Sequence, residues 1–187
     1  MSGESLLGTA VGLALAAIAL AGLALLAQAA WAQHGALRAE VAVTAAWLGV
    51  SDRLAGDVRE GAVDDARLAN RPVAYADARE VRLVVGHSGG YRCVAWRLGG
   101  EWRLHRAVYI SAGCPSPAPD AWVDAVTLSR RAWSVAWPRA RFCSPSAQEV
   151  ILADAVDGAC GGTLTARGPD GLDRALPPVR GLSRAAR

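Results

Sequence analysis

Four cysteines are the residues of this chain whose chemistry is best constrained by their spacing. They stand at Cys93, Cys114, Cys143 and Cys160, without a C-x-x-C pair and without a histidine at ligand spacing. Structural zinc sites draw their ligands from such close pairs, so we expect no metal site. An even number of cysteines beyond an apolar N-terminal segment indicates disulfides formed in an oxidising compartment.

The pairing of these cysteines is open at the level of sequence, because four cysteines allow three arrangements. Cys93 with Cys114 and Cys143 with Cys160 would close loops of about 17 to 21 residues, each stabilising the fold by roughly 3 kcal/mol. We favour this arrangement. Four buried free thiols are the alternative.

A second pattern with chemical potential is Gly86-His87-Ser88-Gly89-Gly90, which matches G-x-S-x-G and follows an expected strand. In a nucleophile elbow this pattern leads from a strand into a helix, which aims the serine and its oxyanion donors. Tyr91 to Leu98 is β-like instead, and His105 is the one histidine that comes later. We therefore expect a hairpin loop with glycines at positive φ, and no enzymatic activity.

Acidic residues raise the question of a cation site. Asp64 and Asp65 are adjacent, and Asp154 and Asp157 fall in a segment expected to be irregular. The chain has no D-x-D-x-D-G run of the kind that builds calcium loops. We expect these carboxylates to be solvated, with no metal and no cofactor bound.

The element that precedes all of these residues is an apolar N-terminal segment. Leu6 to Ala27 contains no charged residue. At 1.5 Å per residue a helix of this length spans about 33 Å, enough for the core of a bilayer. The segment is expected to be a transmembrane helix.

A secretory signal peptide is an alternative for the same segment. Ala30-Trp31-Ala32 offers a small-x-small cleavage site before Gln33. However, the first five residues carry Glu4 and no basic residue, and the apolar run exceeds the usual length of a signal peptide. A permanent single-pass anchor is the third interpretation.

Residues 32–68 are expected to continue the same helix with an amphipathic pattern. No proline interrupts them before Leu68, and charged residues fall mostly on other faces than the apolar ones. Gly56 and Gly61 each cost about 1 kcal/mol in a helix interior, so a stop is expected near Gly61. The apolar positions expected to face a core are Leu37, Val41, Ala45, Leu48, Leu54 and Val58.

The remainder of the chain, residues 69–187, reads as one β-rich domain of ordinary size. Its expected strands are 80–85, 91–98, 101–110, 133–137 and 163–167, with a two-residue turn at Gly99-Gly100 and a turn at 168–171. Residues 111–120 and 143–162 are expected to be loops, and the basic tail 177–187 to be partly disordered. Trp102, Leu104, Val108 and Ile110 share one parity and are expected to face the long helix.

Charge excludes one class of partner. The formal net charge is +3 and the arginines are scattered along the chain. Proteins that bind nucleic acid concentrate positive charge on one face, so direct binding of nucleic acid is not expected.

Three segments resemble the type IV pilin-like superfamily. Gly3-Glu4-Ser5-Leu6-Leu7-Gly8 and the residues after it look like the class III signal, which a prepilin peptidase cuts after the glycine. Residues 51–62 resemble the L-x-R-D-L-R-x-A segment of W-type minor pilins and J-type pseudopilins, and residues 91–106 are similar to their Y-x-L hairpin. The resemblance covers the N-terminal third well, the hairpin moderately, and the part of the chain beyond it only in general character.

Two positions depart from this family. The family usually has phenylalanine directly after the cut, where this chain has Glu4, and glutamate four positions later, where it has Gly8. In the family that glutamate is thought to meet the N-terminal amine of a neighbour in the apolar filament core, where an unpaired charge is costly. Its absence suits a subunit at a filament tip, and equally a chain that the peptidase never cuts.

Together these observations predict an α+β protein whose long N-terminal helix packs on an antiparallel sheet. The expected parts are a leader (1–3), a transmembrane helix (4–31), an amphipathic helix (32–68) and a head (69–187). The resemblance implies processing between Gly3 and Glu4, and a minor pilin or pseudopilin in the inner membrane with its head in the periplasm. Its implied partners are other minor pilins or pseudopilins and the prepilin peptidase. The alternative interpretation of the chain is a secreted or membrane-anchored periplasmic binding domain with an ordinary signal peptide. Close helix packing would use the small residues Gly8, Gly12, Ala16 and Gly22.

Overall fold

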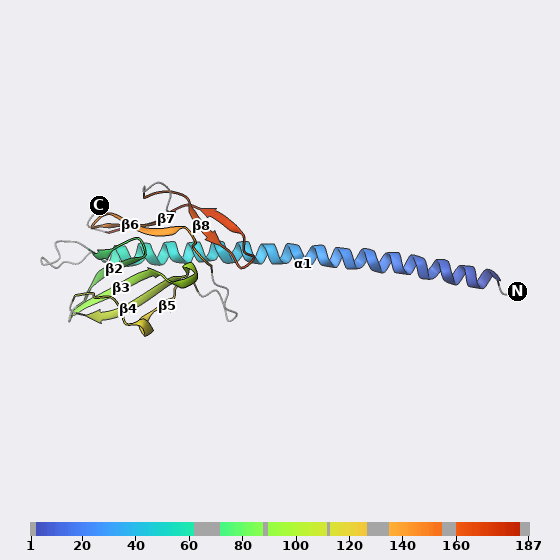
Figure 1. Cartoon of the computed structure of the whole chain (residues 1–187), viewed down its shortest axis with the longest axis horizontal. Coiled ribbons are helices and arrows are strands. Elements are labelled where there is room, and N and C mark those ends of the chain that lie inside the picture. Colours follow the sequence, from blue (N-terminus) through green and yellow to red (C-terminus); the bar gives the residue numbers. More distant parts are fainter. Residues whose placement is uncertain are drawn as a thin grey trace. The chain divides into compact units, whose positions relative to one another are not determined.

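The computed structural model describes residues 3–61, 72–87, 90–111, 113–126, 135–154 and 160–183 (Figure 1). The chain divides into two compact units, Met1–Ala39 and Glu40–Arg187. The helix α1 (Gly3–Glu60) runs through both. The architecture is α+β, as the sequence predicts, and each unit is described below by itself.

In the second unit α1 buries one stripe of side chains. Val43, Ala46, Val50, Leu54 and Val58 are each at most 2% exposed. Their spacing of three and four residues keeps them on one face of the helix.

The stripe expected from sequence was wrong at three of its positions. Leu37, Val41 and Leu48 are 58%, 67% and 53% exposed, whereas Leu54 and Val58 are buried as expected. Apolar residues occupy more than one face of α1, and the pattern of one helix does not say which face its neighbours cover.

The helix ends close to the expected glycine. The amide of Gly61 donates to the carbonyl of Asp57 at 3.0 Å, which closes the last turn. A Cβ at Gly61 would lie 2.5 Å from the Cβ of Pro72, so the close approach of the next described segment requires a glycine. The expected helical residues 62–68 lie outside the described residues.

The first sheet has five antiparallel strands in the order β1-β2-β3-β4-β5. Its members are β1 (Val73–Ala76), β2 (Glu80–His87), β3 (Gly90–Leu98), β4 (Leu104–Ser111) and β5 (Val123–Asp124). Val81, Leu83, Val94, Trp96 and Leu98 turn one face of this sheet to the core that α1 shares. The expected strands 80–85 and 91–98 are confirmed.

The strand β4 corrects two expectations. Val108 lies opposite buried Val94 and shares its face, yet Val108 is 43% and Ile110 71% exposed. Arg92, the partner of Ile110, lies 3.9 Å from Glu60, the last residue of α1. The described part of the helix therefore ends where this part of the sheet face begins, and its side chains do not cover Val108 and Ile110.

The turn between β3 and β4 is also longer than expected. The pairing of Leu98 with Leu104 leaves five residues in the connection, which includes the short 3₁₀ helix η1 (Gly100–Trp102). Glu101 and Trp102 carry the positive φ angles, 55° and 58°, instead of the two glycines. Trp102 is accordingly 38% exposed in a turn and does not face the helix.

The second β layer contains the order β10-β7-β6 and the separate hairpin β8-β9. Its strands are β6 (Ala140–Ser146), β7 (Glu149–Asp154), β8 (Leu164–Arg167), β9 (Asp173–Leu176) and β10 (Val179–Leu182). The expected loop 143–162 is therefore wrong over β6 and β7. Of the tail 177–187, which was expected to be partly disordered, residues 179–182 form β10. The expected strand 163–167 is confirmed over residues 164–167, as is the turn after it. The expected strand 133–137 is described over residues 135–137, which form no strand, and Ala136 makes isolated bridges.

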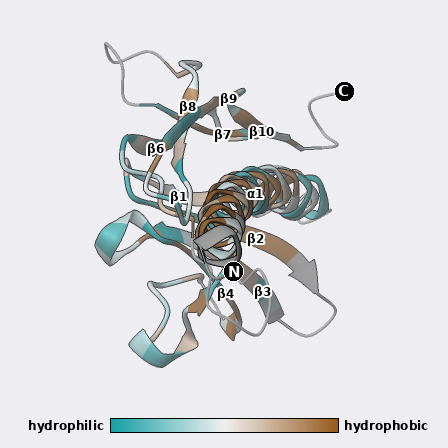
Figure 2. Ribbon diagram, turned by 90° about the vertical axis from the view of Figure 1, so that its right-hand side faces the viewer, coloured by the Kyte–Doolittle hydropathy of each residue, from teal (hydrophilic) through white to brown (hydrophobic). Residues whose placement is uncertain are grey.

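The helical part of the second unit lies between the two β layers (Figure 2). The layers approach each other where the amide of Val73 in β1 donates to Ala147, and the amide of Phe142 in β6 donates to Ala78. On the β10 side, a Cβ at Gly181 would lie 2.7 Å from Val58 Cγ2. Trp96 and Trp137, both fully buried, fill the core.

Candidate functional site: the exposed apolar helix

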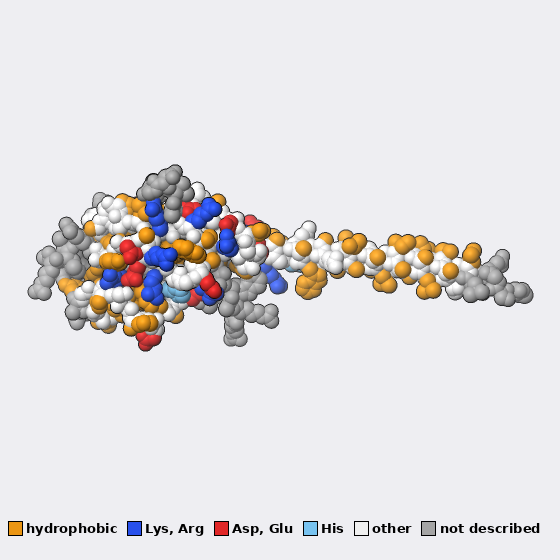
Figure 3. Space-filling model, viewed as in Figure 1, with side chains coloured by type: hydrophobic (Ala, Val, Ile, Leu, Met, Phe, Trp, Pro, Cys, Tyr) orange, Lys and Arg blue, Asp and Glu red, His pale blue; other side chains and the backbone are white. Residues whose placement is uncertain are grey.

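The first unit consists of a helix whose apolar side chains face outward. Leu7, Leu13, Leu15, Ile18, Leu20, Leu23 and Leu26 are each more than 60% exposed (Figure 3). By length and composition α1 is apolar enough either to cross a membrane or to act as a signal sequence. Apolar surface of this extent requires lipid or protein to cover it.

The small residues expected to pack between helices lie on this exposed segment. Gly8, Gly12, Ala16 and Gly22 are all exposed, and a Cβ at each glycine would meet nothing within 4 Å. At 100° per residue they fall within an arc of about 120°, which is one side of the helix. The exposure of these four residues leaves this side available for an approaching helix.

Gly3 and Glu4 stand in the first turn of α1. A cut between them would remove three residues and leave the helix attached to the head. Processing at this position stays a prediction.

A buried ion pair joins α1 to the first sheet in the second unit. Asp57 is 6% exposed and accepts from Arg106 Nε at 2.9 Å, from Arg106 Nη2 at 2.6 Å and from Trp96 Nε1 at 2.7 Å. This hydrogen bonding raises the pKa of Arg106 above its ordinary value. The bidentate geometry satisfies the carboxylate in the core and fixes the rotation of the helix on the sheet.

Sequence reasoning missed the role of Asp57. The residue lies three and seven positions after buried Leu54 and Val50, on the same face of the helix. A carboxylate on an apolar helix face predicts a buried partner. That signal was present in the sequence, although it does not identify Arg106.

Two disulfides fix loops of the head. Cys93 is bonded to Cys114, and Cys143 to Cys160, which is the arrangement that loop length favours. Cys114 brings the segment after β4 onto the outer face of the first sheet, where Arg82 donates to its carbonyl at 3.1 Å. Tyr109 donates to the carbonyl of Pro115 in the same segment, and burial raises the pKa of this tyrosine.

The serine motif lies in the hairpin between β2 and β3. His87 pairs with Gly90 across the turn, and the next element is a strand. The passage from strand to helix that a nucleophile elbow needs is therefore not formed here. Ser88 and Gly89 lie outside the described residues.

The described residues contain no group of three or more His, Cys, Asp or Glu able to hold a metal ion. Asp154 accepts a hydrogen bond from Thr165 at 2.8 Å. Asp64, Asp65 and Asp157 lie outside the part of the chain that the structure describes.

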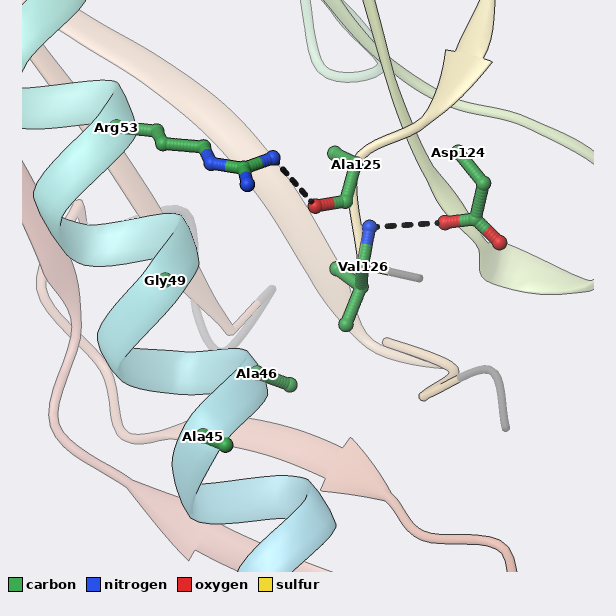
Figure 4. A pocket seen from close by; sticks show the side chains of 7 residues that line it. All are labelled: Ala45, Ala46, Gly49, Arg53, Asp124, Ala125 and Val126. Atoms are coloured by element: carbon green, nitrogen blue, oxygen red, sulfur yellow. Dashed lines mark hydrogen bonds between the residues drawn. The ribbon is translucent and has the colours of Figure 1, made fainter. Parts of the chain in front are cut away.

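A hollow of about 280 Å³ opens beside α1 in the second unit (Figure 4). Small helix residues Ala45, Ala46 and Gly49 form one wall, and 124–126 form the other. Arg53 Nη1 donates to the carbonyl of Ala125 at 3.3 Å. Asp124, the acidic residue of this lining, accepts a hydrogen bond from the amide of Val126 at 3.0 Å.

Comparison with protein-family models, with curated proteins and with solved structures finds no match to this chain. The function is therefore argued from the residues and their geometry.

Proposed function

We propose that this chain is a pilin-like subunit, a minor pilin or pseudopilin, that is held in the inner membrane by α1 and assembles through it. The observation that carries the proposal is the continuity of α1. One helix supplies both an exposed apolar segment and the central core element of a disulfide-bonded β domain. A cleavable signal peptide needs no such structural join to the domain that follows it.

The assembly step follows from the chemistry of the exposed segment. In lipid, helices associate through close packing, and small residues allow two backbones to approach. Gly8, Gly12, Ala16 and Gly22 provide such a side. Because Gly8 replaces the glutamate usual in the family, we place the subunit in a short complex that starts or caps a filament.

The rival is a secreted or membrane-anchored periplasmic binding domain. N-terminal sequencing of the protein from cell envelopes separates the two. A chain that starts at Glu4, with or without N-methylation, supports the pilin-like subunit. A chain that starts at Gln33 has lost the exposed apolar segment of α1 and overturns the proposal, and an intact Met1 leaves a plain membrane anchor.

A deletion strain identifies the machine that the subunit serves. Loss of piliation, of protein secretion or of DNA uptake each assigns one system, with the complemented strain as control. A strain in which all three persist contradicts a role in filament assembly.

A further inference from the structure

The charge pattern of α1 does not by itself say where the helix leaves the membrane. No charged side chain occurs from Ser5 to Leu37. At 1.5 Å per residue this stretch is about 50 Å long, which exceeds the hydrocarbon core of a bilayer by about 20 Å. Another feature must set the level of the lipid surface.

One face of the helix in the first unit carries that feature. Trp31, His34, Gly35 and Arg38 follow one another at helical spacing and line an open hollow of about 480 Å³. Trp31 is 77% exposed, and the other three residues are exposed as well. A tryptophan, a histidine and an arginine thus stand together on one side of the helix.

We propose that this face, which we call the Trp31–Arg38 face, binds the phosphodiester headgroups of the bilayer and sets the depth of α1. The inference rests on the membrane anchorage in the proposed function. Tryptophan is favoured at the boundary between acyl chains and headgroups, because its ring is apolar and its N–H is polar. Arginine pairs with phosphate oxygens in a bidentate geometry.

Side-chain direction carries the guanidinium of Arg38 towards the apolar segment. Helical side chains lean towards the N-terminus, here towards the apolar segment. The guanidinium of Arg38 therefore reaches back over Gly35, which has no side chain to block it, towards the level of His34. A Cβ at Gly35 would meet nothing within 4 Å, so the space above it is open to a headgroup.

The length of the helix agrees with this depth. The rise from Glu4 to Trp31 corresponds to about 40 Å of helix. A bilayer including its headgroup layers is about 40–45 Å thick. With Trp31 at one headgroup layer, the first charged residue of the helix falls at the other, and every residue between them is uncharged.

The test measures depth in the full-length chain. All four cysteines are disulfide-bonded, so a cysteine introduced at Gln33 or Leu20 is a unique site for an NBD fluorophore. The labelled chains are reconstituted into phosphatidylcholine vesicles with and without phosphatidylglycerol. Quenching is compared for nitroxides on the headgroup and on the middle of the acyl chain.

We expect the label at Gln33 to be quenched more by the headgroup nitroxide, and the label at Leu20 more by the acyl-chain nitroxide. The double variant W31L/R38Q should abolish the headgroup preference at Gln33, whereas R59Q, a change at an exposed arginine of the last helical turn, should leave it intact. An unchanged preference in W31L/R38Q overturns the inference. So does a label at Gln33 that is quenched like the label at Leu20.

Co-flotation with the vesicles separates this inference from the function on which it rests. A chain that floats with the vesicles but shows the wrong depth at Gln33 contradicts the Trp31–Arg38 face alone. A chain that does not float contradicts the membrane anchorage, and with it both proposals.

Discussion

Arg106 of β4 holds Asp57 of α1 through two hydrogen bonds of 2.9 and 2.6 Å, and buried Trp96 donates to the same carboxylate. Removing one partner of such a pair leaves an uncompensated charge in the core. We expect D57A to lower the free energy of unfolding by about 2–4 kcal/mol, below the full cost of a buried pair because Arg106 keeps a quarter of its side chain exposed.

Urea denaturation of the detergent-solubilised chain, followed by circular dichroism, measures this change. The double variant D57L/R106M removes both charges and should recover most of the loss, since apolar replacements of a buried pair are often neutral. Equal stability of D57A and the parent protein would show that the pair does not hold the helix on the sheet.

At Gly181, β10 approaches α1 so closely that no room is left for a side chain. A Cβ there would lie 2.7 and 2.9 Å from Val58 atoms and 3.2 Å from the carbonyl of Leu54. We expect G181A to destabilise the head by about 1–3 kcal/mol through overpacking. Thermal unfolding measures the change, and V58A in the same chain should restore part of it.

Gly56 offers a matched control on the same helix. A Cβ at Gly56 would meet nothing within 4 Å, so G56A should stabilise the helix by up to about 1 kcal/mol. If G181A and G56A shift the melting temperature in the same direction, the close approach of β10 to the helix is not the cause.

The type of each element was more predictable than the face it buries. Val41 and Leu48 fit a helical stripe as well as Val43 and Val50 do, and the two choices differ by a rotation of about 160°. The covering layers decide between them, and these come from strands much later in the chain, β10 being the last. Asp57 is the sequence signal that would have favoured the observed face, because Val50, Leu54 and Asp57 share one side.

The strands β6 and β7 were missed for a different reason. Every residue of β7 from Val150 to Asp154 is buried, so the strand lacks the alternation that marks a half-exposed strand. In β6, Pro145 falls where the pairing with β7 shifts register between Cys143 and Ser146. A proline at such an irregularity is tolerated in a strand, although in sequence it resembles a loop.

Removing one disulfide should affect the outer face of the first sheet, whereas removing the other should not. Replacing Cys93 and Cys114 by serine opens a loop of 21 residues and should cost about 3 kcal/mol. It should also release the Pro115 segment from Tyr109, which hydrogen exchange of residues 113–118 would report. The matched change at Cys143 and Cys160 should cost a similar amount without altering exchange in that segment, and a change there would contradict the assignment.

Asp170 gives a pH dependence with a defined sign. Two hydrogen bonds from Arg174, of 2.9 and 2.6 Å, lower the pKa of the Asp170 carboxyl to about 2 from its ordinary 3.8. A carboxyl whose pKa is lower in the folded state stabilises the fold above its unfolded pKa, and the effect is lost as pH falls through the folded pKa. D170N should therefore be less stable than the parent near pH 5, with a difference that shrinks towards pH 2.

Carbon-detected NMR titration of the Asp170 carboxyl tests the cause directly, and R174Q should return its pKa towards the ordinary value. D120N, at an exposed aspartate of η2 (Pro119–Ala121), serves as the control for a change of net charge. A difference between D170N and the parent that stays constant from pH 5 to pH 2 would contradict the ion-pair explanation.

Gly12 separates assembly from folding. It is exposed on the apolar segment, and a Cβ there would meet nothing within 4 Å in the described part of the chain. G12L should therefore leave the melting temperature of the head unchanged, while its larger side chain holds neighbouring helices apart. G12A keeps a small residue and should retain assembly. Co-purification of epitope-tagged subunits from solubilised envelopes measures the difference, and equal recovery with G12L and G12A would exclude this side of α1 as the packing surface.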